Sequence, residues 1–487
     1  MVVQKAIHLE RSIALWGWVQ NKLMHIFLQS LRQGIQRHPL LLLLLFCSIL
    51  YFTTSFWYVQ YSSPPSGDEP HYLVISQTLL KYHSLDVMRD YRNGDYRSFS
   101  PVYINPHVAP NERGQLLPVH SIGAPVLWLL PYYFLGRLGA VWFISLLSVL
   151  IIFNIYKFLL TMHISKRYAL LVSLAYAVAS PVYTYSHLTF IEPIGALVCI
   201  YVLRKVFQKD MTVADVVISS LLLGILPWVH IRFAVLEMPL FFAFLYRIYV
   251  KNKRSNYKHY IYYLIPVTLL FIAFEIYNYT IWGTLNPGSN EINVNSKPFV
   301  VLPFTALLGV FFDQEYGLLL NFPMFIFLLA GIVLVMKKKF VNYTVLMLIL
   351  SIPYFLLFTT FRLWSGGWCP PARFILVLLP LYSFYIAYAL EQMNNVIANL
   401  VFGLVTLYGF AYNLLSLKPV LVGFNSGTGR NHVLAQIHTL LFNRHLTDYL
   451  PSIFFPHHWG LFAMWVSVYV GITLLLLLIS ARRSIAL

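Results

Sequence analysis

The stretch L-L-L-L-L-L-F-C-S-I-L-Y-F-T-T-S-F-W-Y, residues 40–58, decides the fold class of this chain. It has the length and apolar character of a helix crossing the hydrocarbon core of a bilayer, which needs roughly 20 residues. No small-residue cleavage site follows it, so we interpret it as a retained helix and not as a removed signal peptide. Similar runs recur along the 487 residues, of which 59% are hydrophobic and 10% charged. Because soluble domains average about 25% charged residues, the sequence predicts an all-α, polytopic membrane protein.

The composition also excludes several other classes of protein. A disordered chain is poor in apolar residues, and three cysteines in 487 residues cannot form a disulfide framework. The net charge is 34 − 17 = +17, but the basic residues stand in short clusters between apolar runs, a pattern that orients membrane helices. No compact basic face is left for a duplex, so the expected partner is membrane lipid and not nucleic acid.

About twelve apolar runs are long enough to span a bilayer, and the basic clusters predict that both chain termini face the cytoplasm. Residues 1–38 are basic, with apolar residues near helical spacing, which is typical of an amphipathic helix on the cytoplasmic face. The run 121–136, interrupted by Pro125 and Pro131, is expected in the outer interface, because as a span it would place later basic clusters outside. The predicted spans are residues 40–58, 138–160, 168–187, 193–208, 212–229, 233–249, 259–281, 316–336, 341–361, 372–390, 395–416 and 459–480.

An acidic pair follows the first predicted span, in S-G-D-E-P-H-Y, residues 66–72. Pro70 is typical of the first turn of a helix, so Asp68 and Glu69 are predicted at a helix start on the outer membrane surface. A carboxylate in that position serves as a base or metal ligand, or it only caps the helix. The spacing alone leaves both interpretations open.

D-E-x-H-Y after the first transmembrane helix resembles the acidic motif of the GT-C superfamily, membrane glycosyltransferases that use polyprenyl-phosphate sugars. Protein O-mannosyltransferases and aminoarabinose transferases are the relatives it is most similar to. The resemblance extends over residues 40–281 and includes S-I-G-A-P at 121–125 and F-I-E-P at 190–193. Two later strings, F-D-Q-E-Y-G-L-L at 312–319 and W-S-G-G-W-C-P-P-A-R-F at 364–374, resemble bacterial members of the group without an assigned substrate.

The resemblance implies that Asp68 is the catalytic base, which takes the proton of an acceptor hydroxyl as its oxygen attacks the anomeric carbon. The lipid phosphate leaves from the opposite face, so inversion is the expected outcome. Glu69 would orient Asp68 or a bound cation. No cofactor is expected. The carboxylate oxygens of Asp68 and Glu69 are nevertheless ligands of the kind that bind a divalent metal ion, so such an ion stays an alternative.

The leaving phosphate needs positive charge, which guanidinium groups supply well. The candidates are Arg232 in P-W-V-H-I-R-F, Arg362 and Arg373. The alternative for each of them is an arginine at the membrane interface, whose charged end reaches water without binding a substrate. We favour Arg373, because the glycines and prolines of residues 366–371 predict an irregular backbone beside it.

Glu192 is a lone acid between long apolar runs, and such a group is costly in a membrane and usually functional. We favour an active-site role over a position in water at the start of the next helix. Further substrate-binding candidates are two histidines and two tryptophans, and the tryptophans fit an aromatic belt equally well. These candidates are His71, His230, Trp364 and Trp368.

Several features limit the alternatives. Histidines 71, 120, 187 and 230 lack the spacing of a zinc motif, so no zinc site is expected. No phosphate-binding glycine loop indicates a nucleotide donor. Asp313 and Glu315 lie just before a helix predicted to start near Tyr316. Negative charge stabilises the start of a helix, and this structural role is enough to account for both acids.

Two function classes remain, a glycosyltransferase and a transporter or flippase for a polar or lipid-linked substrate. A transporter should place ionisable residues near the bilayer midplane, whereas here they gather at the outer face. We therefore expect a cell-membrane glycosyltransferase with an extracytoplasmic site, a polyprenyl-phosphate-linked donor and a glycan, lipid or protein acceptor. The expected parts are the cytoplasmic segment 1–38, a GT-C-like catalytic transmembrane module 39–281 with external loop 59–120, and a carboxy-terminal module 282–487 with external loops 282–315 and 417–457.

Overall fold

The computed structural model describes most of the chain beyond residue 37. The described residues are 22, 38–61, 64–252, 257–285, 303–336, 340–361, 363–417, 427–442, 446–455 and 457–486. The amphipathic helix expected within residues 1–38 therefore lies almost wholly outside the described residues. Residues 1–47 and 48–487 form two separate compact units, and everything below concerns the second unit except the first residues of α2.

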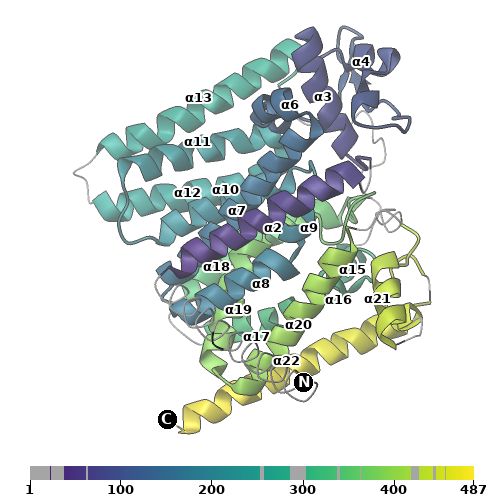
Figure 1. Cartoon of the computed structure of the whole chain (residues 1–487). Helices are drawn as coiled ribbons and strands as arrows, with labels where there is room; N and C mark the ends of the chain where they lie inside the picture. The colour runs from purple at the N-terminus through teal and green to yellow at the C-terminus, as the bar shows by residue number, and fades with distance from the viewer. Residues whose placement is uncertain are drawn as a thin grey trace, which may run out of the picture. The chain divides into compact units, whose positions relative to one another are not determined.

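Helices build nearly all of the described chain (Figure 1). The first half contains α2 (Pro39–Tyr61), α3 (Glu69–Tyr82), α4 (Val87–Asn93), α5 (Gly123–Leu127), α6 (Leu129–Leu135), α7 (Arg137–Thr161), α8 (Lys166–Ala179), α9 (Pro181–Tyr185), α10 (Glu192–Phe207), α11 (Val213–Val229), α12 (Ala234–Asn252) and α13 (Tyr257–Trp282). The second half contains α15 (Pro303–Phe312), α16 (Leu318–Asn321), α17 (Phe327–Met336), α18 (Val341–Thr359), α19 (Leu379–Met393), α20 (Val396–Leu415), α21 (His432–Phe442) and α22 (Trp459–Ala486). Short 3₁₀ helices are η1 (Asp95–Ser98), η2 (Ile231–Phe233), η3 (Pro323–Ile326), η4 (Phe374–Val377) and η6 (Leu446–Tyr449).

Seven helices among the described residues are long and apolar enough to cross a membrane. Several of them expose rows of large apolar side chains, for example Leu269, Phe271 and Ile276 on α13, which is the surface that lipid tails cover. The multi-pass helical membrane class is therefore confirmed, while the count of twelve spans and the orientation of the termini stay predictions. The seven are Pro39–Tyr61, Arg137–Thr161, Ile231–Lys251, Tyr257–Trp282, Val341–Thr359, Val396–Leu415 and Trp459–Ala481.

Three of the predicted spans are broken helices. The run 168–187 is interrupted after Ala179, where Pro181 begins α9 and the Ser180 hydroxyl accepts a hydrogen bond from the Val182 amide. The run 316–336 divides into α16, η3 and α17, and the run 372–390 divides into η4 and α19. Proline near each break lacks an amide hydrogen and cannot continue the preceding helix, a local effect that hydropathy does not register.

The segment 59–120, which the sequence predicts to be an external loop, is a folded layer and not only a connection. Its apolar centre joins α3 to α4 and η1 and contains Val74, Ile75, Val87, Tyr96 and Ile104. The all-α expectation did not include the short hairpin in this loop, formed by β1 (Val108–Pro110) and β2 (Leu116–Pro118), which are antiparallel with Ala109 opposite Leu117. Gly114, at a φ of +75°, supplies the left-handed turn between the strands.

The segment 121–136 forms two short helices, α5 and α6, where the sequence predicted one interrupted helix. Each of them carries one of the two prolines in its first turn, and α3 contacts both. In Figure 1, α3, α4 and α6 lie near one end of α11 and α13, which run side by side. Helix α10 packs between α7, α11 and α12. The first residue of α10, Glu192, is consequently enclosed by the surrounding helices.

The predicted orientation is testable with single cysteines at two exposed positions. In a variant lacking the three native cysteines, which are all buried, we expect a membrane-impermeant maleimide added outside intact cells to label Arg92→Cys and not Lys209→Cys. Arg92 lies in the loop layer and Lys209 between α10 and α11. Labelling of both variants from the same side would contradict the predicted topology.

Candidate active site

Four charged side chains from distant parts of the sequence meet in what we call the ion-pair cluster: Asp68, Glu192, Arg232 and Arg373. Arg373 is at its centre. Its Nε donates to Glu192 Oε1 at 2.8 Å, and its Nη2 donates to Asp68 Oδ2. Arg232 Nη2 donates to the same Glu192 oxygen at 2.5 Å. One carboxylate oxygen thus holds two guanidinium groups together.

Each member of the cluster comes from an irregular point or a helix terminus. Asp68 precedes α3, Glu192 begins α10, and Arg232 lies in η2 between α11 and α12. Arg373 ends the glycine- and proline-rich segment before η4, and its Nη1 donates to the Gly366 carbonyl at 2.7 Å. Such positions leave polar side chains free of the apolar helix faces, so that they gather at one end of the helices.

The cluster is buried on one side and open on the other. Glu192 is fully buried, and the side chains of Arg373 and Arg232 are 5% and 13% exposed. The Asp68 side chain is 27% exposed and is the member that a ligand reaches first. The two negative charges of the acids equal the two positive charges of the arginines, and buried charges need such pairing.

Asp68 does not cap its helix. It occupies the N-cap position of α3, yet its side chain makes no capping hydrogen bond and pairs with Arg373 instead. The cap-only interpretation is therefore wrong. Burial raises the pKa of the Asp68 carboxyl, but the charge of Arg373 and the nearby His120 outweigh that effect and hold the pKa below its ordinary value. Asp68 is thus a carboxylate at neutral pH.

Aromatic rings orient both guanidinium groups. The Arg373 guanidinium carbon lies 4.4 Å from the centre of the Phe190 ring, and that of Arg232 lies 4.8 Å from the Phe374 ring. Arginine binds aromatic faces through its flat, delocalised charge. This stacking leaves the edges of the guanidinium groups, which carry the hydrogen-bond donors, directed toward oxygen ligands.

The cluster retains unused hydrogen-bonding capacity. Within the described part of the chain, the buried Arg232 Nε and Glu192 Oε2 have no hydrogen-bond partner. An unsatisfied buried polar atom costs roughly 1–3 kcal/mol, so such atoms in a native protein usually belong to a ligand site or contact ordered water. The Arg232 donor is suited to an anionic oxygen.

Glu69 lies next to Asp68 in sequence but has a different environment. It is fully buried, and its carboxylate accepts hydrogen bonds from the Thr189 amide at 2.8 Å and from the Ser66 amide at 3.3 Å. Burial raises the pKa of Glu69 despite these bonds and the charge of Arg137. Glu69 therefore ties the start of α3 to the segment before α10, which carries Glu192.

Gly67 allows the two halves of the site to approach closely. Its φ is +58°, and a Cβ atom at this position would lie 2.3 Å from the Trp368 carbonyl oxygen. Any side chain would clash with that backbone atom. The glycine of S-G-D-E is thus required by a contact with the loop that carries Arg373, which no sequence pattern reveals.

The structure separates the remaining candidates. Trp368 is a 61% exposed residue whose backbone lies beside Gly67, whereas Trp364 is buried against Tyr316 and Phe454. His230 Nδ1 accepts from the Arg232 amide at 3.2 Å and so shapes the turn that presents Arg232. Arg362 lies outside the described residues.

His71 does not contact the ion-pair cluster through a hydrogen bond in the described structure; its Nδ1 shares a hydrogen bond of 2.8 Å with the Tyr91 hydroxyl. It stacks on His107, which the sequence analysis did not single out, and both lie near His120. The loop layer thus brings together histidines that are not close in sequence, a grouping that their spacing along the chain did not indicate.

Asp313 and Glu315 have structural roles away from the cluster. Asp313 accepts the backbone amides of Glu315 and Tyr316 and shapes the turn before α16, but α16 itself begins only at Leu318 and has no side-chain cap. Glu315 instead accepts the amides of Gly427 and Gly429, at 2.9 and 2.7 Å, and so anchors the segment before α21. The helix-start explanation is therefore wrong for Glu315.

The sequence matches no family model and no curated protein. Among solved structures, the chain is similar to ArnT from Cupriavidus metallidurans bound to undecaprenyl phosphate, with a TM-score of 0.49 and 14% identity over 90% of this chain and 76% of that one. It is also similar to the apo oligosaccharyltransferase of Archaeoglobus fulgidus, with a TM-score of 0.48 and 13% identity over 80% of this chain and 57% of that one.

Both neighbours are GT-C membrane glycosyltransferases, the superfamily that the D-E-x-H-Y motif resembles. At these identities and TM-scores the similarity assigns no role to any residue.

Proposed function

We propose that this protein is an integral-membrane glycosyltransferase that transfers a sugar from a polyprenyl-phosphate donor to an acceptor hydroxyl on the external face. The observation that carries the proposal is the ion-pair cluster, in which the partly exposed Asp68 carboxylate pairs with Arg373, and Glu192 joins Arg373 to Arg232, at one end of apolar helices. A donor with a lipid tail and an ionised head needs this combination of an apolar helix surface and fixed positive charge.

The two arginines supply the binding site for the donor phosphate. Arg232 has an unused Nε donor among the described residues, and Arg373 reaches the open side of the cluster through its bond to Asp68. Charge-assisted hydrogen bonds from guanidinium to phosphate are strong and directional. Glu192 is a positioning residue here, since it holds both guanidinium groups on one oxygen.

Asp68 is the general base. It is ionised, partly exposed and directly beside the arginine that meets the phosphate. When the phosphate shares the charge of Arg373, the pKa of Asp68 rises toward its ordinary value and the carboxylate becomes a better proton acceptor. Donor binding thereby prepares the base.

In the transfer step, the acceptor oxygen forms a bond to the anomeric carbon while its proton moves to Asp68. The bond between the anomeric carbon and the phosphate oxygen breaks, and its electron pair stays on the polyprenyl phosphate. Attack opposite the leaving phosphate inverts the configuration at the sugar. Arg232 and Arg373 stabilise the charge that develops on the leaving group.

Glu69 and His230 act as positioning residues, because Glu69 holds the start of α3 and His230 holds the turn of Arg232. The exposed Trp368 ring is the aromatic surface available for stacking on the sugar. The buried position of Trp364 does not favour direct contact with a substrate.

The proposal is tested with purified protein in nanodiscs and synthetic polyprenyl-phosphate sugars, measuring release of free polyprenyl phosphate and formation of a glycosylated product. We expect both to appear together in the presence of a membrane extract that contains acceptors. Movement of intact donor across the bilayer without release of polyprenyl phosphate would instead identify a transporter or flippase.

A further inference from the structure

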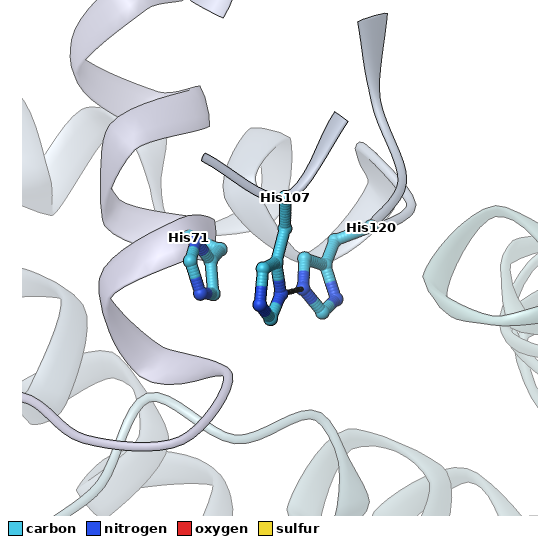
Figure 2. Close-up of side chains that lie close together, drawn as sticks. All are labelled: His71, His107 and His120. Carbon is cyan, nitrogen blue, oxygen red and sulfur yellow. Dashed lines mark hydrogen bonds between the residues drawn. The ribbon is translucent and has the colours of Figure 1, made fainter. Parts of the chain in front are cut away.

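Three histidines of the external loop lie together beside the candidate active site. His71 is on α3, His107 immediately precedes β1, and His120 follows β2 shortly after its last residue. Figure 2 shows their rings side by side, with His107 between the other two. One ligand-capable atom from each residue lies within 4.8 Å of the others. We refer to these residues as the histidine trio.

The hairpin produces this arrangement. Strand β1 pairs with β2 so that Val108 lies opposite Pro118, and the Val119 amide donates to the His107 carbonyl at 3.2 Å. The residues just beyond the paired strands, His107 and His120, are therefore neighbours. The trio depends on tertiary structure and lacks any compact motif in the sequence.

The spacing of nitrogen atoms fits a metal ion. His107 Nδ1 lies 3.2 Å from His120 Nε2. Two nitrogen ligands at about 2.0–2.1 Å from a tetrahedral zinc ion are themselves about 3.3 Å apart. The third ring, His71, is stacked on His107 with centroids 3.7 Å apart, and its ligand atom lies within 4.8 Å of those of the other two residues. Binding of one ion by all three requires the His71 ring to turn out of this stack.

The surroundings of the trio also suit a cation. The Tyr91 hydroxyl binds His71 Nδ1 at 2.8 Å, and such an outer partner commonly orients a metal-bound histidine. The Asp68 carboxylate is near enough to interact electrostatically with His120 and His71, so a negative charge is already present. His107 is exposed, which gives an ion access from solvent.

We propose that His71, His107 and His120 bind a divalent transition-metal ion of the zinc class, with His71 oriented by Tyr91. Imidazole nitrogen favours zinc, copper, nickel or cobalt, whereas magnesium and calcium favour oxygen ligands. The ion would hold the β1–β2 hairpin against the first turn of α3, the helix that directly follows Asp68. This site does not depend on the proposed transfer reaction, because its three ligands are not members of the ion-pair cluster.

The test is metal content of the full chain, purified in detergent without a histidine tag. The protein is first treated with a chelator, then incubated with Zn²⁺ or Co²⁺ and freed of excess ion. We expect one bound ion per chain by elemental analysis and, for Co²⁺, the visible absorption typical of a tetrahedral site. Bound Zn²⁺ should also raise the thermal unfolding temperature, since a ligand of the native state stabilises it.

Three variants make the assignment specific. His107→Ala should abolish stoichiometric binding while the protein stays folded, because this side chain is exposed. Tyr91→Phe should weaken binding by about 10- to 100-fold, the usual effect of losing an outer partner. His83→Asn is the matched control: His83 is an exposed histidine of the same loop, in a left-handed conformation that asparagine tolerates.

The proposal is overturned if the wild-type chain binds neither ion, or if His107→Ala binds as much as wild type. In either case the trio is a stack of hydrogen-bonded imidazoles. The readouts are metal content and unfolding temperature, so a failure of the metal site and a failure of the proposed transferase activity are observed separately.

Discussion

The Asp68→Asn variant is expected to lose sugar transfer by about 10²- to 10⁴-fold, the usual contribution of a general base. Asparagine keeps the size of the side chain, and its carbonyl oxygen still accepts a hydrogen bond from Arg373, so the loop that carries it should stay in place. It cannot take the proton of the acceptor hydroxyl. The measurement is the transfer rate from a polyprenyl-phosphate donor in nanodiscs, with thermal unfolding recorded in parallel.

The same loop offers a matched control. Asp86 also occupies a helix N-cap position without a capping hydrogen bond from its side chain, at the start of α4, and it is exposed. Asp86→Asn should leave both transfer and stability unchanged. Near-normal transfer by a stable Asp68→Asn protein would remove Asp68 from the mechanism and make Glu192 the next base to test.

Replacement of Arg373 should impair donor binding and not only the chemical step. Arg373→Lys keeps the positive charge but loses the forked donor geometry. The loss of one charge-assisted hydrogen bond, about 1.5–3 kcal/mol, corresponds to a roughly 10- to 150-fold weaker affinity. Arg373→Ala should lose more. The measurement is equilibrium binding of a labelled polyprenyl phosphate to the protein in nanodiscs.

The alanine variant also affects folding, so the lysine variant is the more informative of the two. Removing Arg373 leaves Asp68 without its ion-pair partner and Glu192 with Arg232 alone, and breaking a buried ion pair costs about 3–5 kcal/mol. Arg430→Lys is the matched control, because Arg430 pairs with Asp448 on the exposed surface. Wild-type donor affinity in a folded Arg373→Lys protein would place the phosphate at Arg232 or Arg362 instead.

The sequence predicted the class of the protein because membrane spans are encoded locally. A run such as residues 40–58 carries its own signal, since about 20 apolar residues cross a bilayer whatever surrounds them. The same reasoning did not predict that the helices break within residues 168–187, 316–336 and 372–390. Hydropathy averages over a run and does not register the hydrogen bonds that a proline removes.

The sequence identified the residues of the candidate site but not the ion pairs and hydrogen bonds that they form with one another. Asp68, Glu192, Arg232 and Arg373 stood out as charges at predicted helix ends, and they form one cluster. Their pairing was not predictable, because an ion pair leaves no periodic pattern in the sequence. Glu69 illustrates the difference: it is adjacent to Asp68 in the chain, yet its carboxylate binds the Thr189 amide.

By itself, the sequence determined a helical membrane protein with several acids and arginines at helix ends, because burial of apolar residues in lipid follows from local composition. Tertiary structure decided which charges meet. Asp68 and Arg373 are 305 positions apart. They meet because Gly67 lies against the Trp368 backbone and because α10 packs against η4, which Arg373 precedes. The histidine trio likewise exists only because the β1–β2 hairpin places His107 beside His120. Contacts of this kind depend on the relative positions of whole elements, and those positions are set by the sum of many weak packing interactions.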